Sequence, residues 1–278
     1  MTGSISAEVL ALRKRASTWI LLGIWTALAV FFAYVLPYVS YVNGSGGPAQ
    51  EPLSDLLPQR LVGNVLAGFP FFGGVFALMV GVLTLGSEYG WGTLKTLLIQ
   101  RPGRLHLFAA KLVAVAAALV PFVLSVFVLG AVASVAIAWR EGAAVEWPAA
   151  WLFVRALGAG WLILAVWAAL GVALGVLSRG TALAIGVGVL YALVIEGLIS
   201  ALAGQVALLE PLVELFLRAN AYSVVEGLGV TAGDAADNGP GTFSGPFVGG
   251  GRALVVLVGY LAAFVLVAGG LIRRRDVA

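Results

Sequence analysis

Two ionisable side chains stand inside long apolar stretches, where a charge is available for pairing, for carrying a proton or for holding a charged substrate. Glu196 is the only acid deep in such a stretch, eight residues before Gly204, or about 12 Å from the end of the stretch at helical rise. Arg155 lies seven residues after Pro148, about 10 Å along the preceding stretch. Because a charge at the bilayer centre costs roughly 2.5–3.5 kcal/mol, we expect Glu196 and Arg155 to form an ion pair. Substrate or proton handling by Glu196 and snorkelling are the alternatives.

No other constellation of residues that could do chemistry is present. The sequence has no cysteine, which excludes disulfides, thiolate metal sites and a cysteine nucleophile, and its one histidine, His106, cannot form an HExxH zinc site. A P-loop ends in Gly-Lys-Ser or Gly-Lys-Thr, yet Lys14, Lys95 and Lys111 follow Arg, Leu and Ala. We therefore predict no catalytic residue, no metal site and no cofactor in this chain, and ATP hydrolysis would need another subunit.

Composition assigns the chain to a membrane. Residues of the AVILMFWYC set make up 61% of it and charged residues only 10%, and the mean hydropathy is +1.05, too little charge to cover the surface of a soluble domain. A hydrocarbon core of about 30 Å needs about 20 helical residues. Six charge-poor runs of that order predict an all-α integral membrane protein with a single transmembrane domain. They are residues 17–39, 61–86, 112–138, 150–177, 181–203 and 253–272.

Lysines and arginines predict the orientation of these spans. The side that holds the N-terminus, residues 87–111, residues 178–180 and the C-terminus carries 11 of the 16 basic residues, and the other side carries 4. Since cytoplasmic loops are rich in Lys and Arg, both termini are expected to be cytoplasmic. The basic residues flank apolar runs and form no patch with interleaved aromatics, so we exclude nucleic-acid binding.

A surface helix is predicted within residues 1–16, before the first span. In the stretch 4–15, Ile5, Val9 and Leu12 share one helical face, and the stretch ends in three basic residues. Such a pattern is typical of a helix that lies on the inner membrane surface.

The region 204–252, on the outer side, is the longest connection. Residues 210–218 read as a short helix with a proline in its first turn, and the following stretch is rich in Gly, Asp and Pro. The role of residues 229–251 stays open.

The loop 87–111 contains a short amphipathic helix. Leu94, Leu97 and Leu98 recur at i, i+3 and i+4, and Pro102-Gly103 ends the helix. Because the helix is joined directly to the second and third spans, a soluble partner that grips it could pass motion into the membrane. A helix that rests on the bilayer surface is the alternative.

This loop resembles a known family. Glu88-Tyr89, Gly92-Thr93-Leu94, Leu97-Leu98, Arg101-Pro102, Arg104 and Lys111 are similar to the pattern between the second and third spans of type-2 ABC transporter permeases, the bacterial drug and lipid exporter class. Six spans, inside termini, an N-terminal surface helix and a long outer connection resemble that family over the whole chain.

The resemblance implies a role for each segment outside the spans. Residues 89–100 would be a coupling helix on a separate nucleotide-binding ATPase subunit, which carries ATP and Mg²⁺; residues 4–15 would be the connecting helix, and residues 205–228 short re-entrant helices over the exit. The coupling residues would be Glu88, Tyr89, Gly92, Thr93, Leu94, Leu97, Leu98 and Arg101. The resemblance further implies a homodimer in the bacterial plasma membrane that exports an amphipathic or apolar drug, peptide or lipid by alternating access.

One aromatic face is a candidate substrate path. Phe69, Phe72 and Phe76 share a helical face in the second span, beside Pro70. In the resembled family the second and fifth spans line the central path, so this face would touch an apolar substrate. Packing against lipid or the protein core is the alternative.

Two other functional classes stay open. An ion-coupled secondary carrier would use Glu196 as its ion site, although the sequence has no internal repeat. A membrane-embedded enzyme is disfavoured because HExxH, GxSxG and paired intramembrane acids are absent. Gly171 and Gly175 form a GxxxG element, which allows close approach of helices.

Overall fold

The computed structural model describes residues 2–44, 52–90, 103–203, 206–229 and 248–274. Within these ranges the regular structure is helical, without strands. Six helical runs are long and apolar enough to cross a membrane, which confirms the all-helical fold and the six candidate transmembrane helices, and each run overlaps one predicted range. The runs are Ala16–Val42, Pro58–Gly90, Arg104–Glu141, Ala150–Ser178, Ala182–Ser200 and Gly250–Arg274.

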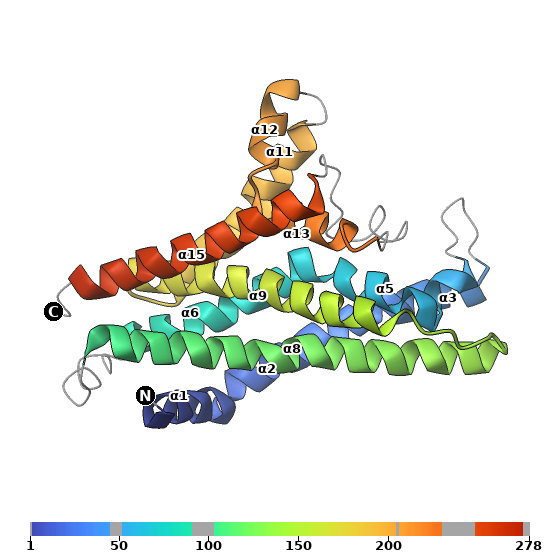
Figure 1. Ribbon diagram of the computed structural model, residues 1–278, viewed down its shortest axis with the longest axis horizontal. Helices are drawn as coiled ribbons and strands as arrows, with labels where there is room; N and C mark the ends of the chain where they lie inside the picture. The colour runs from blue at the N-terminus through green and yellow to red at the C-terminus, as the bar shows by residue number, and fades with distance from the viewer. Residues whose placement is uncertain (1, 45–51, 91–102, 204–205, 230–247, 275–278) are drawn as a thin grey trace.

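The six spans differ in regularity (Figure 1). The third, fourth and sixth are the uninterrupted helices α8 (Arg104–Glu141), α9 (Ala150–Ser178) and α15 (Gly250–Arg274). The first, second and fifth each contain a π-helical turn. Their elements are α2 (Ala16–Val30), η1 (Phe31–Val35) and α3 (Leu36–Val42); η2 (Pro58–Arg60), α5 (Leu61–Ala67), η3 (Phe69–Gly73) and α6 (Gly74–Gly90); and α10 (Ala182–Leu190), η4 (Tyr191–Ile195) and α11 (Glu196–Ala203). The short α4 (Leu53–Leu56) precedes the second span.

Pro70 explains the π-helical turn η3 in the second span. Proline has no backbone N–H, and its ring crowds the preceding turn of a helix. The chain accommodates it with a wider turn, in which the Gly73 amide donates to the Gly68 carbonyl at 3.0 Å, five residues back. The wider turn rotates the side chains that follow it relative to those before it.

The second and fourth spans form the core of the bundle. In the most apolar stretch of each, 67% of the residues are buried, against 39% or less in the other four spans. A Cβ atom added to Gly81 would lie 2.0 Å from the Ala168 carbonyl oxygen, and one added to Gly171 would lie 2.1 Å from that of Leu78. Only glycine allows two helix backbones to approach so closely, so Gly171 of the GxxxG element packs within the chain.

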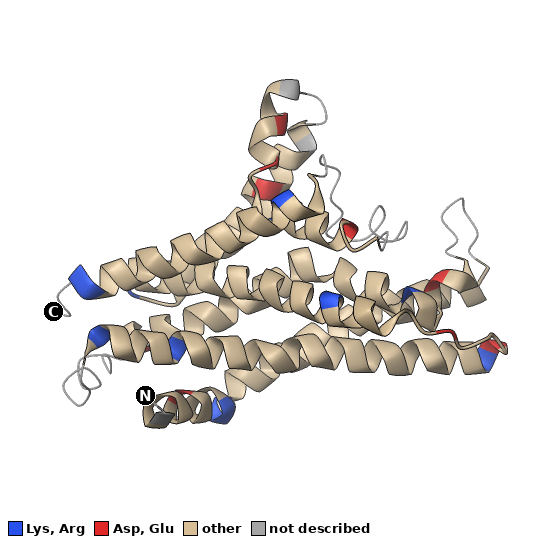
Figure 2. Ribbon diagram, viewed as in Figure 1, with Lys and Arg blue, Asp and Glu red and all other residues tan. Residues whose placement is uncertain are grey.

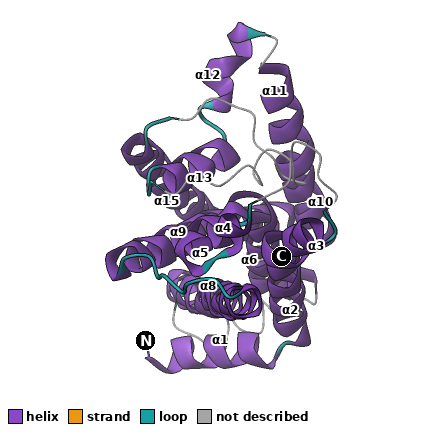
Figure 3. Ribbon diagram, turned by 90° about the vertical axis from the view of Figure 1, so that its right-hand side faces the viewer, coloured by secondary structure: helices purple, strands orange, loops and turns teal. Residues whose placement is uncertain are grey.

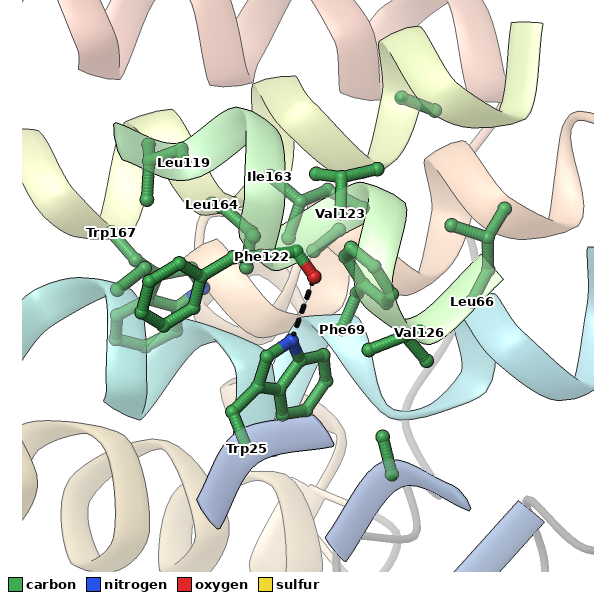
Figure 4. Packing of buried hydrophobic residues seen from close by; sticks show 14 of the residues in the cluster. Trp25, Leu66, Phe69, Leu119, Phe122, Val123, Val126, Ile163, Leu164 and Trp167 are labelled. Atoms are coloured by element: carbon green, nitrogen blue, oxygen red, sulfur yellow. Dashed lines mark hydrogen bonds between the residues drawn. The ribbon is translucent and has the colours of Figure 1, made fainter. Parts of the chain in front are cut away.

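Trp25 fastens the first span to this core (Figure 4). Its side chain is fully buried, and its indole Nε1 donates to the Phe122 carbonyl of α8 at 3.1 Å. The Trp161 indole of α9 donates to the Ala116 carbonyl of α8 at 3.0 Å. The two acceptors lie on either side of Pro121, which has no backbone N–H to donate within α8, and the two indoles join three spans in this stretch.

The helix α1 (Thr2–Lys14) lies across the bundle at the end where both ends of the chain lie (Figures 1 and 3). We call this the basic end: it comprises α1, the last turn of α6, the first two turns of α8 and the last turn of α15. Figure 2 shows Lys and Arg gathered there. The helix that is predicted before the first span is therefore present, and it runs crosswise to the spans.

The connection between the fifth and sixth spans contains three described helical elements. They are η5 (Ala207–Leu209), α12 (Glu210–Val213) and α13 (Leu217–Glu226). The prediction of one continuous helix over 210–218 is therefore wrong. The helix α12 ends at Val213, and α13 begins at Leu217, after Phe216, which has an extended backbone with φ −68° and ψ 146°. A new helix starts there because a side chain from the fifth span binds its first amides, as described below.

Candidate functional site

Lys111 of α8 is the centre of a buried ionic cluster at the basic end. Its side chain is only 1% exposed. The ammonium Nζ donates to Oε2 of Glu8 in α1 at 2.9 Å and to Oε1 of Glu88 in α6. Three helices that are distant in the sequence are thus joined by one side chain.

Arg15 adds a second positive charge to the cluster. It lies where α1 ends and α2 begins, and its Nη1 donates to the Leu83 carbonyl at 2.7 Å and to the Ser87 Oγ at 3.3 Å. The Arg15 charge acts on Glu88 from this position. We call Glu8, Arg15, Glu88 and Lys111 the ionic cluster; it contains two acids and two bases and is electrically neutral.

The burial of three of these charges, on Glu8, Glu88 and Lys111, constrains the geometry of these helices. Each buried ion loses several kcal/mol of hydration, which only close partners of opposite charge offset. The cluster is therefore stable only while α1, α6 and α8 keep their relative positions. The end of α6, at Gly90, and the start of α8, at Arg104, border residues 91–102. The cluster joins both of these helices to the N-terminal helix α1.

Glu8 was not predicted as a site residue, although α1 buries it at 8% exposure. The predicted apolar face of Ile5, Val9 and Leu12 is that of a helix on the membrane surface, a prediction that the 37% exposure of Val9 does not contradict; Leu12 is 5% exposed. An acid three residues after Ile5 and four before Leu12 was the available signal, since that spacing also defines one helical face.

Of the predicted coupling residues, two lie within the described residues and six lie outside them. Glu88 and Tyr89 belong to α6, where Glu88 is buried and Tyr89 half-buried. Gly92, Thr93, Leu94, Leu97, Leu98 and Arg101 lie outside the described residues. The chain enters α8 through Gly103, whose φ of +93° favours glycine. Lys111, which the family resemblance includes, is the partner that the structure gives to Glu88.

The residues of the predicted aromatic face of the second span are unequally buried. Phe69 is fully buried, with its ring centroid 5.3 Å from that of Trp25, so it belongs to the core. Phe72 and Phe76 are half-buried at the edge of the core: Phe72 stacks on Phe32 of η1 at 5.6 Å, and Phe76 lies 6.2 Å from the same Trp25 ring. Phe71, also half-buried, lies on the side of Phe72.

The structure does not bring Glu196 and Arg155 together. Arg155 is exposed on α9, whereas Glu196 is fully buried at the start of α11. The Glu196 Oε1 accepts the Leu217 amide at 2.9 Å and its Oε2 accepts the Arg218 amide at 3.1 Å. The expected pairing is wrong because the first turn of α13 supplies two N–H donors and the positive end of a helix dipole, which satisfy the carboxylate without a salt bridge to Arg155.

No metal site is formed by the described part of the chain, in which no three His, Cys, Asp or Glu side chains cluster. At the basic end, the ionic cluster joins the helix α1 to the two spans that border residues 91–102.

One comparison with known proteins finds a match. Residues 4–195 of the 278-residue chain match the model of a family described as ABC-2 family transporter protein. The match begins in α1, includes the whole ionic cluster and ends one residue before Glu196. A comparison with curated proteins gives no match.

Proposed function

Because the chain belongs to the ABC-2 family of transporter proteins, a family of type-2 ABC transporter permeases, we propose that it is the membrane-spanning subunit of an exporter driven by a separate ATPase. Members of this family are multi-pass membrane components of transport systems, and they are not themselves catalytic. The ATPase subunit would hold the ATP and Mg²⁺.

The ionic cluster is the observation that carries the coupling part of this proposal. It joins the connecting helix α1 to both ends of the loop 91–102, which contains the leucines of the predicted coupling helix. A force on this loop would therefore act on α1, α6 and α8 together. If one of these helices moved away from the other two, a buried charge would be exposed or left without its ion-pair partner. Such rigid attachment is what transmission from an ATPase to the membrane requires.

The proposed orientation places the basic end in the cytoplasm, with both termini, in the plasma membrane of a bacterium. The excess of Lys and Arg at this end supports the orientation. Trp139 at the end of the third span, Trp147 in the connection and Trp151 at the start of the fourth span are 51–88% exposed and would lie at the opposite membrane interface.

A second copy of the permease would complete the pathway. In the most apolar stretch of the first, fifth and sixth spans, only 17–22% of the residues are buried. These spans therefore retain apolar surface for lipid or for another copy. An amphipathic or apolar drug, peptide or lipid would pass along aromatic residues of the second span. Phe72 and Phe76 remain candidates for this path, and Phe71 replaces Phe69.

The coupling helix can be tested with the double substitution Leu94→Asp and Leu97→Asp. We expect the variant to insert normally but to lose the ATPase subunit on purification from the native host, because two charges would disrupt an apolar docking face. Leu208→Asp, at a residue of η5 that is 84% exposed, is the matched control and should keep the subunit.

Two outcomes would contradict the proposal. Unchanged association of the double variant would refute the coupling role of residues 89–100. Reproducible isolation of the unaltered chain without any ATPase, together with transport that does not depend on ATP, would instead favour an ion-coupled carrier.

A further inference from the structure

The fifth span consists of two halves that pack differently. Its first half, α10, packs on α6 and α9 of the core. Its second half, α11, packs mainly on η5 and α12 and projects with them from the bundle (Figure 1). The π-helical turn η4 separates the two halves, and π-helical turns are frequent at functional sites in helices.

Glu196 binds α13 directly after this turn. As the first residue of α11, it has no exposed surface, and each carboxylate oxygen accepts one backbone amide of the first turn of α13. The Tyr191 side chain, at the start of η4, interacts electrostatically with the same carboxylate. Glu196 therefore joins the projecting half of the fifth span to α13.

The helix α13 is in turn held by the body of the protein. All nine residues from 217 to 225 are buried. At the segment just before α13, the Tyr260 hydroxyl of α15 donates to the Leu215 carbonyl at 2.9 Å, and Arg252 of α15 pairs with Glu214 at 2.9 Å. The Ser223 hydroxyl of α13 accepts the Val248 amide at 3.1 Å. The position of α13 is thus tied to the sixth span.

We propose that Glu196 is a positioning residue that holds α11 against α13, and that α11 pivots about η4 when the carboxylate releases the two amides. The angle between the halves of the fifth span would then depend on one buried carboxylate. The attachment of α11 to α13 by Glu196 follows from the geometry alone. A role of the pivot in the transport cycle rests on the proposed function.

The chemistry of the carboxylate predicts which substitutions break this attachment. A carboxylate offers an acceptor oxygen to each amide, whereas Glu196→Gln offers one oxygen and turns an NH₂ donor toward the other N–H. Glu196→Asp keeps both oxygens on a shorter side chain. The Gln variant should release α11, and the Asp variant should retain part of the attachment.

A second variant removes a donor and leaves Glu196 in place. Leu217 is the first residue of α13, a position where proline is well tolerated in helices. Phe216 before it already has the extended conformation that a following proline requires. Leu217→Pro therefore deletes one hydrogen bond to Glu196 and should loosen α11 even if Glu196→Gln fails to insert.

The chain has no cysteine, so pairs of spin labels can be placed without background sites. Labels at Leu198 of α11 and Val132 of α8, both exposed, report the pivot by double electron–electron resonance. Labels at Leu183 of α10 and Val132 are the control pair, because α10 lies before the pivot. Labelled chains are diluted with unlabelled ones so that only distances within one chain contribute.

We expect Glu196→Gln and Leu217→Pro to broaden the 198–132 distance distribution and leave the 183–132 distribution unchanged, with Glu196→Asp closer to the unaltered chain. A narrow, unshifted 198–132 distribution in both Glu196→Gln and Leu217→Pro would overturn the positioning role.

The transport consequence is measured separately on the complex with its ATPase. Glu196→Gln should change kcat for ATP hydrolysis several-fold at unchanged KM for ATP, and Glu196→Asp should restore most of it. Altered distances with unaltered kcat would show that α11 moves without a role in the cycle. Failure to isolate any complex would instead count against the proposed function.

Discussion

At the scale of single residues, buried charges constrain the relative positions of the helices. Lys111 is nearly inaccessible and has two acidic partners from two other helices, and Arg15 completes a neutral cluster. The cluster demands accurate helix positions because any charge left alone would be buried without compensation.

Lys111→Met should destabilise the protein by about 3–5 kcal/mol, because it leaves Glu8 and Glu88 buried side by side. Thermal unfolding in detergent would measure the loss, and Lys14→Met, at an exposed lysine of α1, is the matched control. Adding Glu8→Gln and Glu88→Gln to Lys111→Met should recover part of the stability. Equal melting temperatures for the Lys111 and Lys14 variants would contradict the role of the cluster.

The unequal burial of the aromatic face predicts different costs for two alanine substitutions. Phe69→Ala should cost about 3–5 kcal/mol, since it opens a cavity beside Trp25 in the core. Phe72→Ala should cost clearly less, because its ring is only half-buried, and it is the variant expected to alter transport. The same unfolding assay compares the two, and a larger loss for Phe72→Ala would reverse the assignment.

At the scale of elements, glycines determine how the core helices cross. The backbones of α6 and α9 touch at Gly81 and Gly171, where no side chain fits. The helices α13 and α15 likewise meet at glycine, since a Cβ atom on Gly227 would lie 2.8 Å from the Gly250 Cα.

Gly81→Val should abolish the folded state, because its Cβ would lie 2.0 Å from a backbone oxygen of α9 that cannot move without the helix. Gly186→Val in α10 has no atom within 4 Å of its Cβ and serves as the control. Monodisperse yield on size-exclusion chromatography is the measurement. A normal yield of Gly81→Val would show that α6 and α9 are farther apart.

The burial of α13 predicts a loss of stability at high pH. Burial raises the pKa of the Tyr222 phenol to about 12 from the ordinary value of 10.0. Between these values the unfolded chain releases the proton while the folded chain keeps it, so stability present below pH 10 falls by about 3 kcal/mol as the pH rises through 12. Tyr222→Phe should remove this part of the pH dependence, and ultraviolet difference absorbance between the two proteins should place the phenol titration near pH 12.

At the scale of the whole molecule, charge asymmetry along the bundle is the basis of the proposed orientation. The basic end holds α1, the cluster and both described ends of the chain (Figure 2). The opposite end holds the exposed tryptophans at the end of α8, at the start of α9 and in the connection between them.

Cysteine labelling in intact cells tests this orientation. Since the chain lacks cysteine, Gly3→Cys and Val145→Cys each introduce one exposed thiol, at opposite ends of the bundle. A membrane-impermeant maleimide should label Val145→Cys in intact cells and Gly3→Cys only after the membrane is opened. Labelling of Gly3→Cys in intact cells would reverse the orientation.

The sequence by itself determined the helical class and the number of candidate spans. In lipid, every backbone N–H and C=O must be satisfied within the segment, so a run of about 20 apolar residues has little choice but a helix. The Glu88 to Lys111 pattern also identified the segment at which the buried cluster is found, and the family match agrees with the resemblance.

Only the tertiary structure decided which sides of these helices meet. One residue turns a helix by about 100°, and a single π-helical turn shifts the faces beyond it, so spacing alone did not show that Phe69 is fully buried and Phe72 half-buried. Glu8 of α1 binds Lys111 of α8, and Glu196 binds amides of α13 in place of Arg155. These pairings join residues far apart in the chain, so local spacing does not identify the partner of either acid.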